Sequence, residues 1–326
     1  MSPRKLLIDC DPGIDDAIAL LLAFASPAEL HLLGITTVAG NVGPSLTARN
    51  ARIVRQLARR EEIPVHAGCD RPLLREPVDA GHFHGPSGLG SADIFEPRVP
   101  LAAGHAVNFI IETLHQHPAG SVSLAITGPM TNVALAMRMA PDIVPRIHEL
   151  VIMGGARSAG GNITASAEYN IYADPHAAAI VLRSGCPVVM CGLDVTHQVR
   201  AGPERVAAVR ALGGPVAQFA ADLLDFANHL TPNAAHGVAT ALHDPCTIAW
   251  LLQPRLFVGR PAAVDVEVAS PLTLGATAVE FRADHGRALH VQWLTEADED
   301  GVFALLNERL APFPPVPAGI RARTIS

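Results

Sequence analysis

Four aspartates fall within eight residues close to the start of the chain: Asp9, Asp11, Asp15 and Asp16. They lie between a short apolar run that predicts a buried strand and an apolar segment that predicts a buried helix. Pro12-Gly13 supplies the turn, because proline presets φ and glycine tolerates a tight reversal. Capping of the helix explains one aspartate but not four. Carboxylates this close repel one another, so their chemistry is that of a hard cation, Ca²⁺ or Mg²⁺, bound at the carboxyl end of a strand.

Two later aspartates stand directly before proline. Asp174-Pro175 and Asp244-Pro245 both have the form of a helix start, with aspartate as the N-cap and proline in the first turn. From the local sequence alone, capping is the preferred interpretation of both. The sequence offers nothing near Asp174 that suggests another role.

Other polar residues have both a chemical and a structural interpretation. His84, in a glycine-rich loop, is a ligand, an acid or a solvated loop histidine. Thr127 begins Thr-Gly-Pro, a turn whose carbonyls point toward the ligand edge of a parallel sheet. Glu168 and Asn170, two residues apart, would share a face of an extended segment and could bind vicinal hydroxyls, or simply belong to a polar surface loop.

The elements that must position these groups alternate between strand and helix patterns. We expect strands at about 6–8, 30–38, 121–126, 149–153 and 187–191, and helices at 15–25, 47–60, 105–117, 132–139 and 175–184. The pattern from 203 to 253 is helical, with interruptions near 231–233 and 243–245. We then expect short strands at 264–268, 278–281 and 289–293, followed by a helix at 296–310. The irregular, glycine-rich stretches at 68–104 and 154–173 are candidates for functional loops. This order predicts one α/β domain over residues 1–326, with a mostly parallel sheet flanked by helices.

The composition narrows the class of protein. Hydrophobic residues make up 49% and charged residues 17% of the 326 residues, enough for a large core. A net charge of -7 argues against nucleic acid as a partner. Five scattered cysteines without a CxxC pair suit a reducing compartment. The start lacks a signal-peptide pattern and the apolar run 14–25 is too short to span a bilayer, so we expect a cytoplasmic protein away from the membrane. The arginines expected on the exposed face of the helix at 47–60 are Arg49, Arg52, Arg55, Arg59 and Arg60.

Taken together, these motifs resemble those of the inosine-uridine preferring nucleoside hydrolases. The stretch Asp9–Asp16 resembles the N-terminal signature of that family. Seven further matches follow in the family's order: Val38–Asn41, His84–Leu89, Thr127–Asn132, Met153–Gly155, Gly161-Asn162, Ala167–Asn170 and Leu242–Pro245. The resemblance spans nearly the whole chain and implies a Rossmann-like fold and a ribonucleoside N-ribohydrolase that forms a homo-oligomer, a dimer or a tetramer.

The resemblance also implies roles for individual residues. A single Ca²⁺ would be bound by Asp11, Asp16, Asp244 and the main-chain oxygen of Thr127, and Asp11 would be the general base for the attacking water. The residues implied to hold the sugar hydroxyls are Asp15, Asn41, Asn162, Glu168 and Asn170. His84 would contact the 5′ side of the ribose or the base. An anionic pocket suits this reaction, because positive charge develops on the ribosyl ring.

The leaving base needs stabilisation by a proton or by stacking. His243 is the candidate general acid, since an ordinary histidine pKa near 6.5 suits proton donation near neutrality. Tyr169 and Phe83 are candidates for packing on the base. The sequence departs from relatives here, with Pro86 in place of an acidic residue and no tyrosine between Phe226 and Leu242. The polar residues available between them are Asn228, His229, Asn233 and His236.

Three other functions compete with this interpretation. A phosphatase of the haloacid dehalogenase type also opens with a strand and Asp-x-Asp, but the lysine and the second Ser/Thr motif that phosphoryl transfer needs have no evident match. A dinucleotide-binding oxidoreductase lacks its G-x-G-x-x-G after a strand. A ribose-binding protein without catalysis would keep the sugar contacts and would bind nucleosides without turnover. Within the hydrolase interpretation, a related riboside is the alternative substrate.

Overall fold

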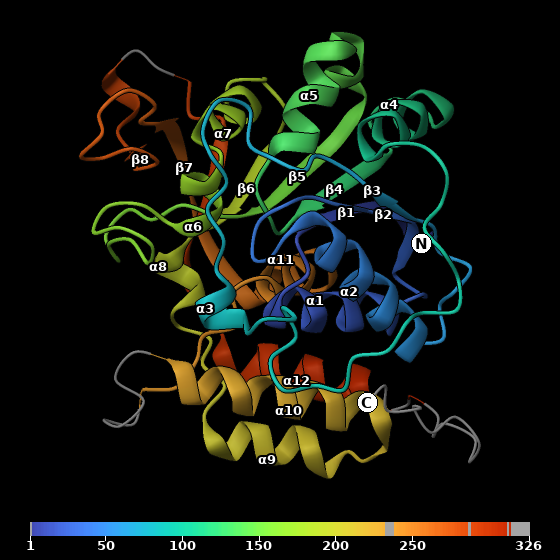
Figure 1. Cartoon of the computed structure of the whole chain (residues 1–326). Coiled ribbons are helices and arrows are strands. Elements are labelled where there is room, and N and C mark those ends of the chain that lie inside the picture. The colour runs from blue at the N-terminus through green and yellow to red at the C-terminus, as the bar shows by residue number, and fades with distance from the viewer. Residues whose placement is uncertain (1, 232–237, 286–287, 312, 314–326) are drawn as a thin grey trace.

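The computed structural model describes residues 2–231, 238–285, 288–311 and 313, and within them nine strands form one sheet (Figure 1). Its order is β3-β2-β1-β4-β5-β6-β9-β7-β8. The strands are β1 (Arg4–Cys10), β2 (Leu30–Thr37), β3 (Val65–Ala67), β4 (Val122–Ile126), β5 (Ile147–Met153), β6 (Val188–Cys191), β7 (Phe257–Val266), β8 (Thr277–Glu280) and β9 (Val291–Ala297). The predicted α/β class with a mostly parallel sheet is therefore confirmed.

The parallel part of the sheet runs from β3 to β9 and places the ligand edge. Its first six strands lie in the order 3-2-1-4-5-6. The order therefore proceeds to one side from β1 and to the other side from β4, although these two strands are parallel neighbours. Ligands of open α/β sheets bind at such a switch point, beyond the carboxyl ends of the strands. The aspartate-rich turn follows β1 and Thr127 follows β4, so both lie at this point. β7 and β8 close the far edge with antiparallel pairing.

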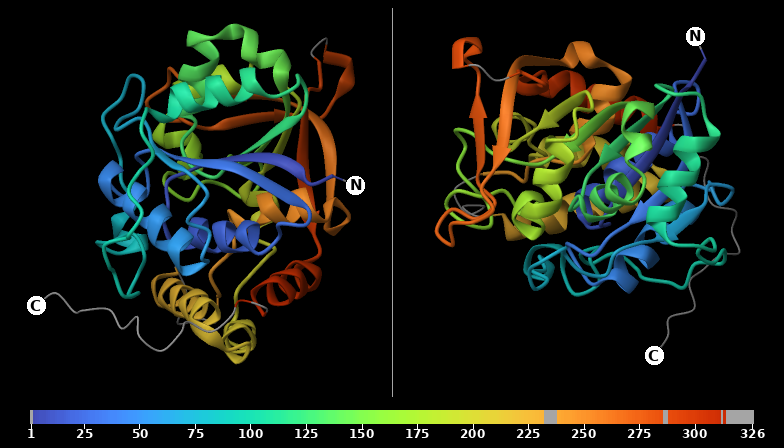
Figure 2. Two further views of the ribbon diagram at one scale, coloured as in Figure 1. Left: turned by 90° about the vertical axis from the view of Figure 1, so that its right-hand side faces the viewer. Right: turned by 90° about the horizontal axis from the view of Figure 1, so that it is seen from above.

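Helices cover both faces of the sheet, as two views at right angles show (Figure 2). One core cluster joins the sheet to α1 (Ile14–Phe24), α2 (Pro44–Leu57), α10 (Gly214–Leu230), α11 (Pro245–Leu252) and α12 (Glu299–Leu310). A second cluster joins the opposite face to α4 (Ala106–Gln116), α5 (Thr131–Met139) and α7 (Pro175–Leu182). α9 (Pro203–Ala211) packs on α10. Because helices cover both faces, side chains on both sides of the central strands β1 and β4 are buried, and most of these side chains are apolar.

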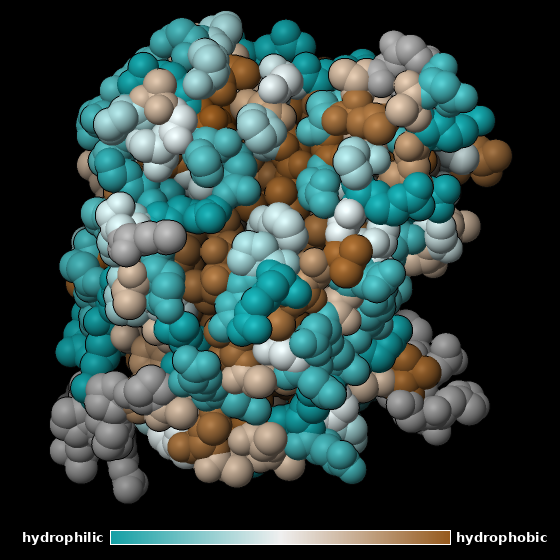
Figure 3. All heavy atoms as spheres, turned by 180° about the vertical axis from the view of Figure 1, so that it is seen from behind, coloured by the Kyte–Doolittle hydropathy of each residue, from teal (hydrophilic) through white to brown (hydrophobic). Residues whose placement is uncertain are grey.

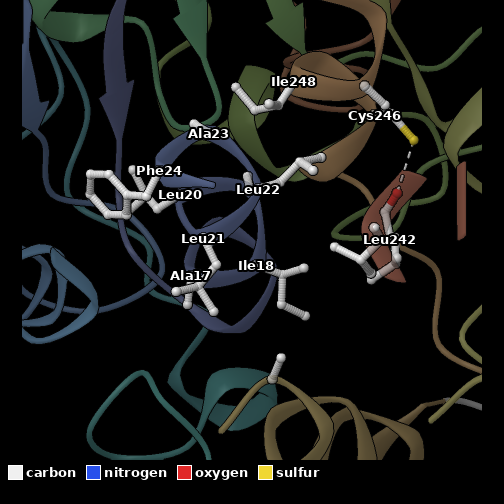
Figure 4. Packing of buried hydrophobic residues seen from close by; sticks show 14 of the residues in the cluster. Ala17, Ile18, Leu20, Leu21, Leu22, Ala23, Phe24, Leu242, Cys246 and Ile248 are labelled. Carbon is white, nitrogen blue, oxygen red and sulfur yellow. Dashed lines mark hydrogen bonds between the residues drawn. The ribbon is translucent and has the colours of Figure 1, made fainter. Parts of the chain in front are cut away.

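The packing of α1 against α11 fixes the relative position of two segments that lie more than 200 residues apart in the sequence (Figure 4). Side chains of α1, Ile18 and Leu22 among them, lie in one buried cluster with Ile248 of α11. Cys246 and Leu242 belong to the same cluster, and the Cys246 thiol donates to the Leu242 carbonyl at 3.1 Å. The segment between these two residues, which holds His243 and Asp244, is thereby anchored close to the start of α1.

Several elements differ from their predicted bounds. β3 was not predicted, and β7 begins at Phe257 rather than at 264. The prediction that Arg55 is solvated is wrong: its side chain is buried and donates to the carbonyls of Ile63 and Val99. Arg52 on the same helix also donates to the Val99 carbonyl. These arginines hold the end of the long 68–104 loop against α2.

The surface is mostly polar on the face seen from behind (Figure 3). Hydrophilic residues cover most of that face, and hydrophobic residues show mainly in recesses between them. No helix in the described parts of the chain combines the length and the apolar character needed to cross a lipid bilayer.

Candidate active site

A cavity of about 590 Å³ lies where several parallel strands end. Its wall includes Asp15 from the first turn of α1, Asn41 from the segment after β2 and Thr127 from the turn after β4. Two short helices, α3 (Gly81–His84) and α6 (Tyr169–Ala173), also contribute, as does His197, which directly follows α8 (Leu193–Thr196). The cavity therefore occupies the ligand edge expected from the strand order.

Most of the residues predicted to act in the site meet at this cavity. Those on its wall are Asp15, Asn41, His84, Thr127, Asn162, Glu168, Asn170, His243 and Asp244. Asp11 and Asp16 are fully buried and are not part of the wall. They lie beneath it, through their contacts to Asn41 and Thr127.

The aspartate cluster joins the first turn of α1 to the first turn of α11. One carboxylate oxygen from each of Asp15, Asp16 and Asp244 lies within 4.8 Å of the others. The group that the structure assembles thus contains Asp15, which the sequence interpretation assigned to the sugar, next to Asp16 and Asp244. The capping interpretation of Asp244 is wrong, because its side chain makes no capping hydrogen bond at the start of α11. Asp174 does cap α7, accepting from the Ala177 amide at 3.0 Å, as predicted.

Asp16 is held in place from three sides. Its Oδ2 accepts from the Gly13 amide at 3.0 Å and from the Asn41 side chain at 3.1 Å. Its Oδ1 accepts from the Thr127 hydroxyl at 2.8 Å. The Gly13 contact caps α1, so Asp16 both starts the helix and belongs to the cluster.

Asp11 sits between two glycines that leave no room for a side chain. A Cβ on Gly40 would lie 2.0 Å from Asp11 Oδ2, and one on Gly128 would lie 2.4 Å from Oδ1. Oδ2 accepts from the Asn41 amide at 2.7 Å. Oδ1 is buried and has no hydrogen-bond partner. A buried carboxylate oxygen without a partner is costly unless a proton or a cation accompanies it.

Burial raises the pKa of every carboxyl group in the cluster. The charge of Asp16 adds to this effect for Asp11 and Asp15, and the charges of the neighbouring aspartates add to it for Asp244. The pKa of Asp15 rises to about 7, and the pKa values of Asp11 and Asp244 are also raised well above the ordinary value. Near neutral pH the cluster therefore takes up protons or a cation.

Asp9 supports the site from behind. Its Oδ1 accepts from the Thr36 hydroxyl at 2.5 Å and from the Asn132 side chain at 2.8 Å. Burial raises the pKa of Asp9 to about 7. Asn132 also accepts from the Cys69 amide at 2.9 Å and so links β1 to the start of the long loop.

These observations fit a hard divalent cation. The donors that converge here are carboxylate oxygens of Asp15, Asp16 and Asp244. Oδ1 of Asp11, which lies outside this group, is buried without a hydrogen-bond partner. The Thr127 carbonyl accepts from the Asn170 side chain at 2.8 Å, which leaves its second lone pair free. An all-oxygen donor set of this charge is what Ca²⁺ and Mg²⁺ prefer.

The polar groups on the far side of the cluster are fixed by backbone contacts. Glu168 caps α6, and its carboxylate accepts from the amides of Asn170, Ile171 and Gly155. Asn162 is exposed to the cavity, and its Oδ1 accepts from the Tyr169 amide at 2.9 Å. These contacts set the positions of the side chains before any ligand binds.

His84 is fixed as a neutral ring. Its Nδ1 lies 3.0 Å from the Ile14 amide, which donates to it, so Nδ1 carries no proton. Burial lowers the pKa of His84 to about 3, and His82 adds to this shift. Only Nε2 of this ring is left to donate toward a ligand.

His243 does not have the ordinary pKa on which its predicted role was based. Burial lowers that pKa to about 3, with smaller effects from His197, His84 and Arg200. Burial therefore favours the neutral form of this ring near pH 7. Its Nδ1 lies 2.8 Å from the Thr196 hydroxyl.

Sequence reasoning missed part of the cavity wall. His197, Arg200, Leu230 and Thr240 all line it. One sequence signal could have identified His197. It lies beyond the carboxyl end of a strand, because only the short helix α8 separates it from β6. Of the two aromatic candidates, Tyr169 lines the cavity with its hydroxyl bonded to the Val78 carbonyl at 2.7 Å, and Phe83 lines it too.

The polar residues proposed for base recognition near α10 have other positions. Asn228 donates to the Ala201 carbonyl at 2.8 Å and accepts from the Thr240 amide at 2.7 Å, so it holds two backbone segments together. His229 contacts the Asp225 carbonyl and is not on the cavity wall. Asn233 and His236 lie outside the described residues.

Comparison with known proteins identifies a family match over nearly the whole chain. The model of the family described as inosine-uridine preferring nucleoside hydrolase matches residues 6–304. The chain is 39% identical to the inosine-uridine preferring nucleoside hydrolase of Crithidia fasciculata, covering 94% of this chain and 98% of that protein. It is 44% identical to the pyrimidine-specific ribonucleoside hydrolase RihA of Salmonella typhimurium, covering 94% and 97%.

A solved structure matches equally far along the chain. The purine-preferring ribonucleoside hydrolase from Gardnerella vaginalis superposes with a TM-score of 0.88 at 32% identity, covering 94% of this chain and 98% of that one. The three relatives are named for three different base preferences. The shared fold and sequence therefore extend across proteins that differ in the base they act on.

Proposed function

This chain belongs to the inosine-uridine preferring nucleoside hydrolase family, and on that premise we propose that it hydrolyses ribonucleosides to ribose and free base with Ca²⁺ as its metal ion. The family match and the relatives identify a ribonucleoside hydrolase, an enzyme that cleaves N-glycosidic bonds. The observation that carries the proposal is the cavity itself. It brings the buried aspartate cluster, built from both α1 and α11, against a wall of polar groups suited to a sugar.

Asp11 is the proposed base. A water oxygen attacks C1′ of the ribose, its proton passes to a carboxylate oxygen of Asp11, and the C1′–N bond breaks with its electron pair going to the base. Oδ1 of Asp11 supports this role, because it is the carboxylate oxygen that no protein donor occupies. Asn41 holds the other oxygen and so fixes the plane of the carboxylate.

Asp11, Asp16, Asp244 and the Thr127 carbonyl are the proposed ligands of the cation, with Asp15 beside them. When bound there, the cation lowers the pKa of a coordinated water and offsets the repulsion among the carboxylates. The hydrogen bonds from Thr127 and Gly13 to Asp16 orient that carboxylate in advance.

The sugar is held by polar groups around the aspartate cluster. The proposed groups are Asp15, Asn41, Asn162, Glu168 and Asn170, all of which line the cavity. Hydroxyl groups of a ribose can donate to the carboxylates and accept from the amides. The negative charge of these groups also stabilises the positive charge that develops on the ribosyl ring as the bond breaks.

The departing base is stabilised by donors rather than by an imidazolium. His243, neutral at pH 7, offers an N–H to the base as negative charge grows on it. Phe83 and Tyr169 provide faces for packing. His84 is available to the same ligand through its Nε2.

Steady-state kinetics test this function. The calcium-loaded protein is incubated separately with inosine, uridine, cytidine and adenosine, and released ribose is measured as reducing sugar. We expect hydrolysis of at least one of the four, abolished by chelation and restored by Ca²⁺. Tight binding of these nucleosides without any release of ribose would instead identify a binding protein.

A further inference from the structure

We propose that Thr196 is a positioning residue that fixes the tautomer and the orientation of His243, so that the N–H of this ring faces the leaving base. The inference rests on the proposed hydrolysis of nucleosides. It concerns which nitrogen of the ring carries the hydrogen that faces the cavity, and it is argued from the hydrogen bond between the two side chains.

The contact between the two residues is buried and specific. The Thr196 hydroxyl lies 2.8 Å from Nδ1 of His243. Thr196 is fully buried at the end of α8, and His243 lies on the cavity wall. No hydrogen-bond partner for Nε2 of His243 is found among the described residues, so the cavity is where this nitrogen meets a ligand.

The surroundings of the hydroxyl decide the direction of this hydrogen bond. Within the described part of the chain, His243 is the one hydrogen-bond partner found for the Thr196 hydroxyl. If Nδ1 donated to the hydroxyl, the hydroxyl hydrogen would be buried without an acceptor. If the hydroxyl donates to Nδ1, both groups are satisfied. The second arrangement leaves the ring hydrogen on Nε2, toward the cavity.

The orientation of the ring is restricted from a second side. His197 packs its ring against that of His243 edge to face, with 5.7 Å between the centroids and 61° between the planes. Thr196 and His197 are consecutive, so one short segment after β6 both bonds Nδ1 and limits the tilt of the ring. A donor held this way loses little freedom when the base leaves.

Two variants of Thr196 separate the hydroxyl from the shape of the side chain. Thr196→Val keeps the branched shape and removes the hydroxyl, whereas Thr196→Ser keeps the hydroxyl. The substrates are the nucleoside that the wild type hydrolyses fastest and p-nitrophenyl riboside, whose leaving group needs no hydrogen from the protein. We expect Thr196→Val to lower kcat for the nucleoside about tenfold, with KM and p-nitrophenyl riboside turnover changed less than about twofold. Thr196→Ser should retain most of the nucleoside kcat.

His243→Ala serves as the reference for the whole effect. It should lower nucleoside turnover more than Thr196→Val does, and adding Thr196→Val to it should cause no further loss, because the two residues act through one hydrogen bond. Equal losses on both substrates, a serine variant no better than valine, or additive losses in the double variant would overturn the proposal.

Nitrogen NMR of ¹⁵N-histidine-labelled protein gives a reading that does not depend on turnover. The His243 signals, assigned with His243→Gln, should show an unprotonated Nδ1 and a protonated Nε2 in the wild type and in Thr196→Ser. Thr196→Val should show a mixture of both tautomers. A protonated Nδ1 in the wild type would overturn the proposal. Failure of the wild type to hydrolyse any nucleoside would count against the proposed function, while the NMR result would still decide the role of Thr196.

Discussion

The two ends of the cavity are built in different ways. At the carboxylate end, Asp11, Asp16 and Asn41 follow buried strands or begin α1, and each is at most 6% exposed. At the other end, called here the base end, the wall comes from short helices, the end of α10 and the segment after residue 237. The base-end residues are His82, Phe83, His197, Arg200, Leu230, Val238 and Thr240. Leu230 and Val238 there are 41% and 37% exposed.

We infer from this contrast that the carboxylate end performs the chemistry of the reaction and that the base end determines which base is accepted. The carboxylate end is fixed by backbone hydrogen bonds and by glycines that no side chain could replace, so it tolerates little variation. The base end rests on loops and helix ends, where side chains can change without disturbing the sheet. The relatives agree with this division, since their names share hydrolysis of nucleosides and differ in the base.

The largest effect should come from the carboxylate end. Asp11→Asn keeps an oxygen that can accept from the Asn41 amide but removes the base, so kcat should fall about 10⁴-fold. The thermal midpoint of the metal-free variant should be no lower than that of the wild type, because a buried charge is lost. Turnover within tenfold of the wild type would show that Asp11 is not the base.

The second effect is a loss of stability with rising pH that only the carboxylate end should show. The native pKa of Asp15 is about 7, above its ordinary value of 3.8, so the folded metal-free protein binds more protons than the unfolded chain between these values. The contribution of Asp15 to stability therefore falls as pH rises through this window. His84 and His243 act in the opposite sense, because their pKa values are lowered.

Comparing Asp15→Asn with the wild type cancels the effect of the histidines. In metal-free protein the two midpoints should agree near pH 3.5, below the ordinary pKa of an aspartate, and the variant should melt about 2–5 °C higher near pH 7.5. Added Ca²⁺ should remove or reverse that advantage. A midpoint difference that does not change with pH would contradict the repulsion inferred for this cluster. Phe83→Leu, at the base end, is the matched control and should show a constant difference.

The smallest effect should come from the base end. Phe83→Leu keeps an apolar side chain and loses a ring that lines the cavity. We expect KM to rise about threefold to tenfold, by different factors for purine and pyrimidine nucleosides, with little change in kcat. The measurement is kcat and KM on inosine and uridine. A large fall in kcat on both substrates would mean that the two ends are not separable.

The sequence allowed the carboxylate end to be predicted well. Strand ends carry their own signal, because an apolar run followed by Asp, Asn or Thr-Gly-Pro is visible without a structure. Asp244 carried no such signal, since Asp before Pro is the usual form of a cap. Its place beside Asp15 and Asp16 depends on the packing of α11 on α1, and only the resemblance to the family pointed to it.

Properties that arise from tertiary burial could not be predicted. The ordinary pKa assumed for His243 fails because the folded chain encloses the ring. Arg55 lies on the helix face that periodicity marks as exposed, but the loop that ends near Val99 folds over it. The first half of β7 contains Gly259 and Pro261 and an exposed Val258, so its sequence shows no clear alternation. Its pairing with β9 defines it as a strand.

The central claim is that residues far apart in the sequence, at the starts of α1 and α11, bind one calcium ion at the cavity. Calorimetric titration of metal-free protein with Ca²⁺ tests this claim most directly. The wild type should bind one ion per chain. Asp244→Asn should weaken binding about 100-fold or more, and Asp222→Asn, outside the cavity wall, should leave it unchanged. No binding to the wild type, or equal affinity in Asp244→Asn, would contradict the account.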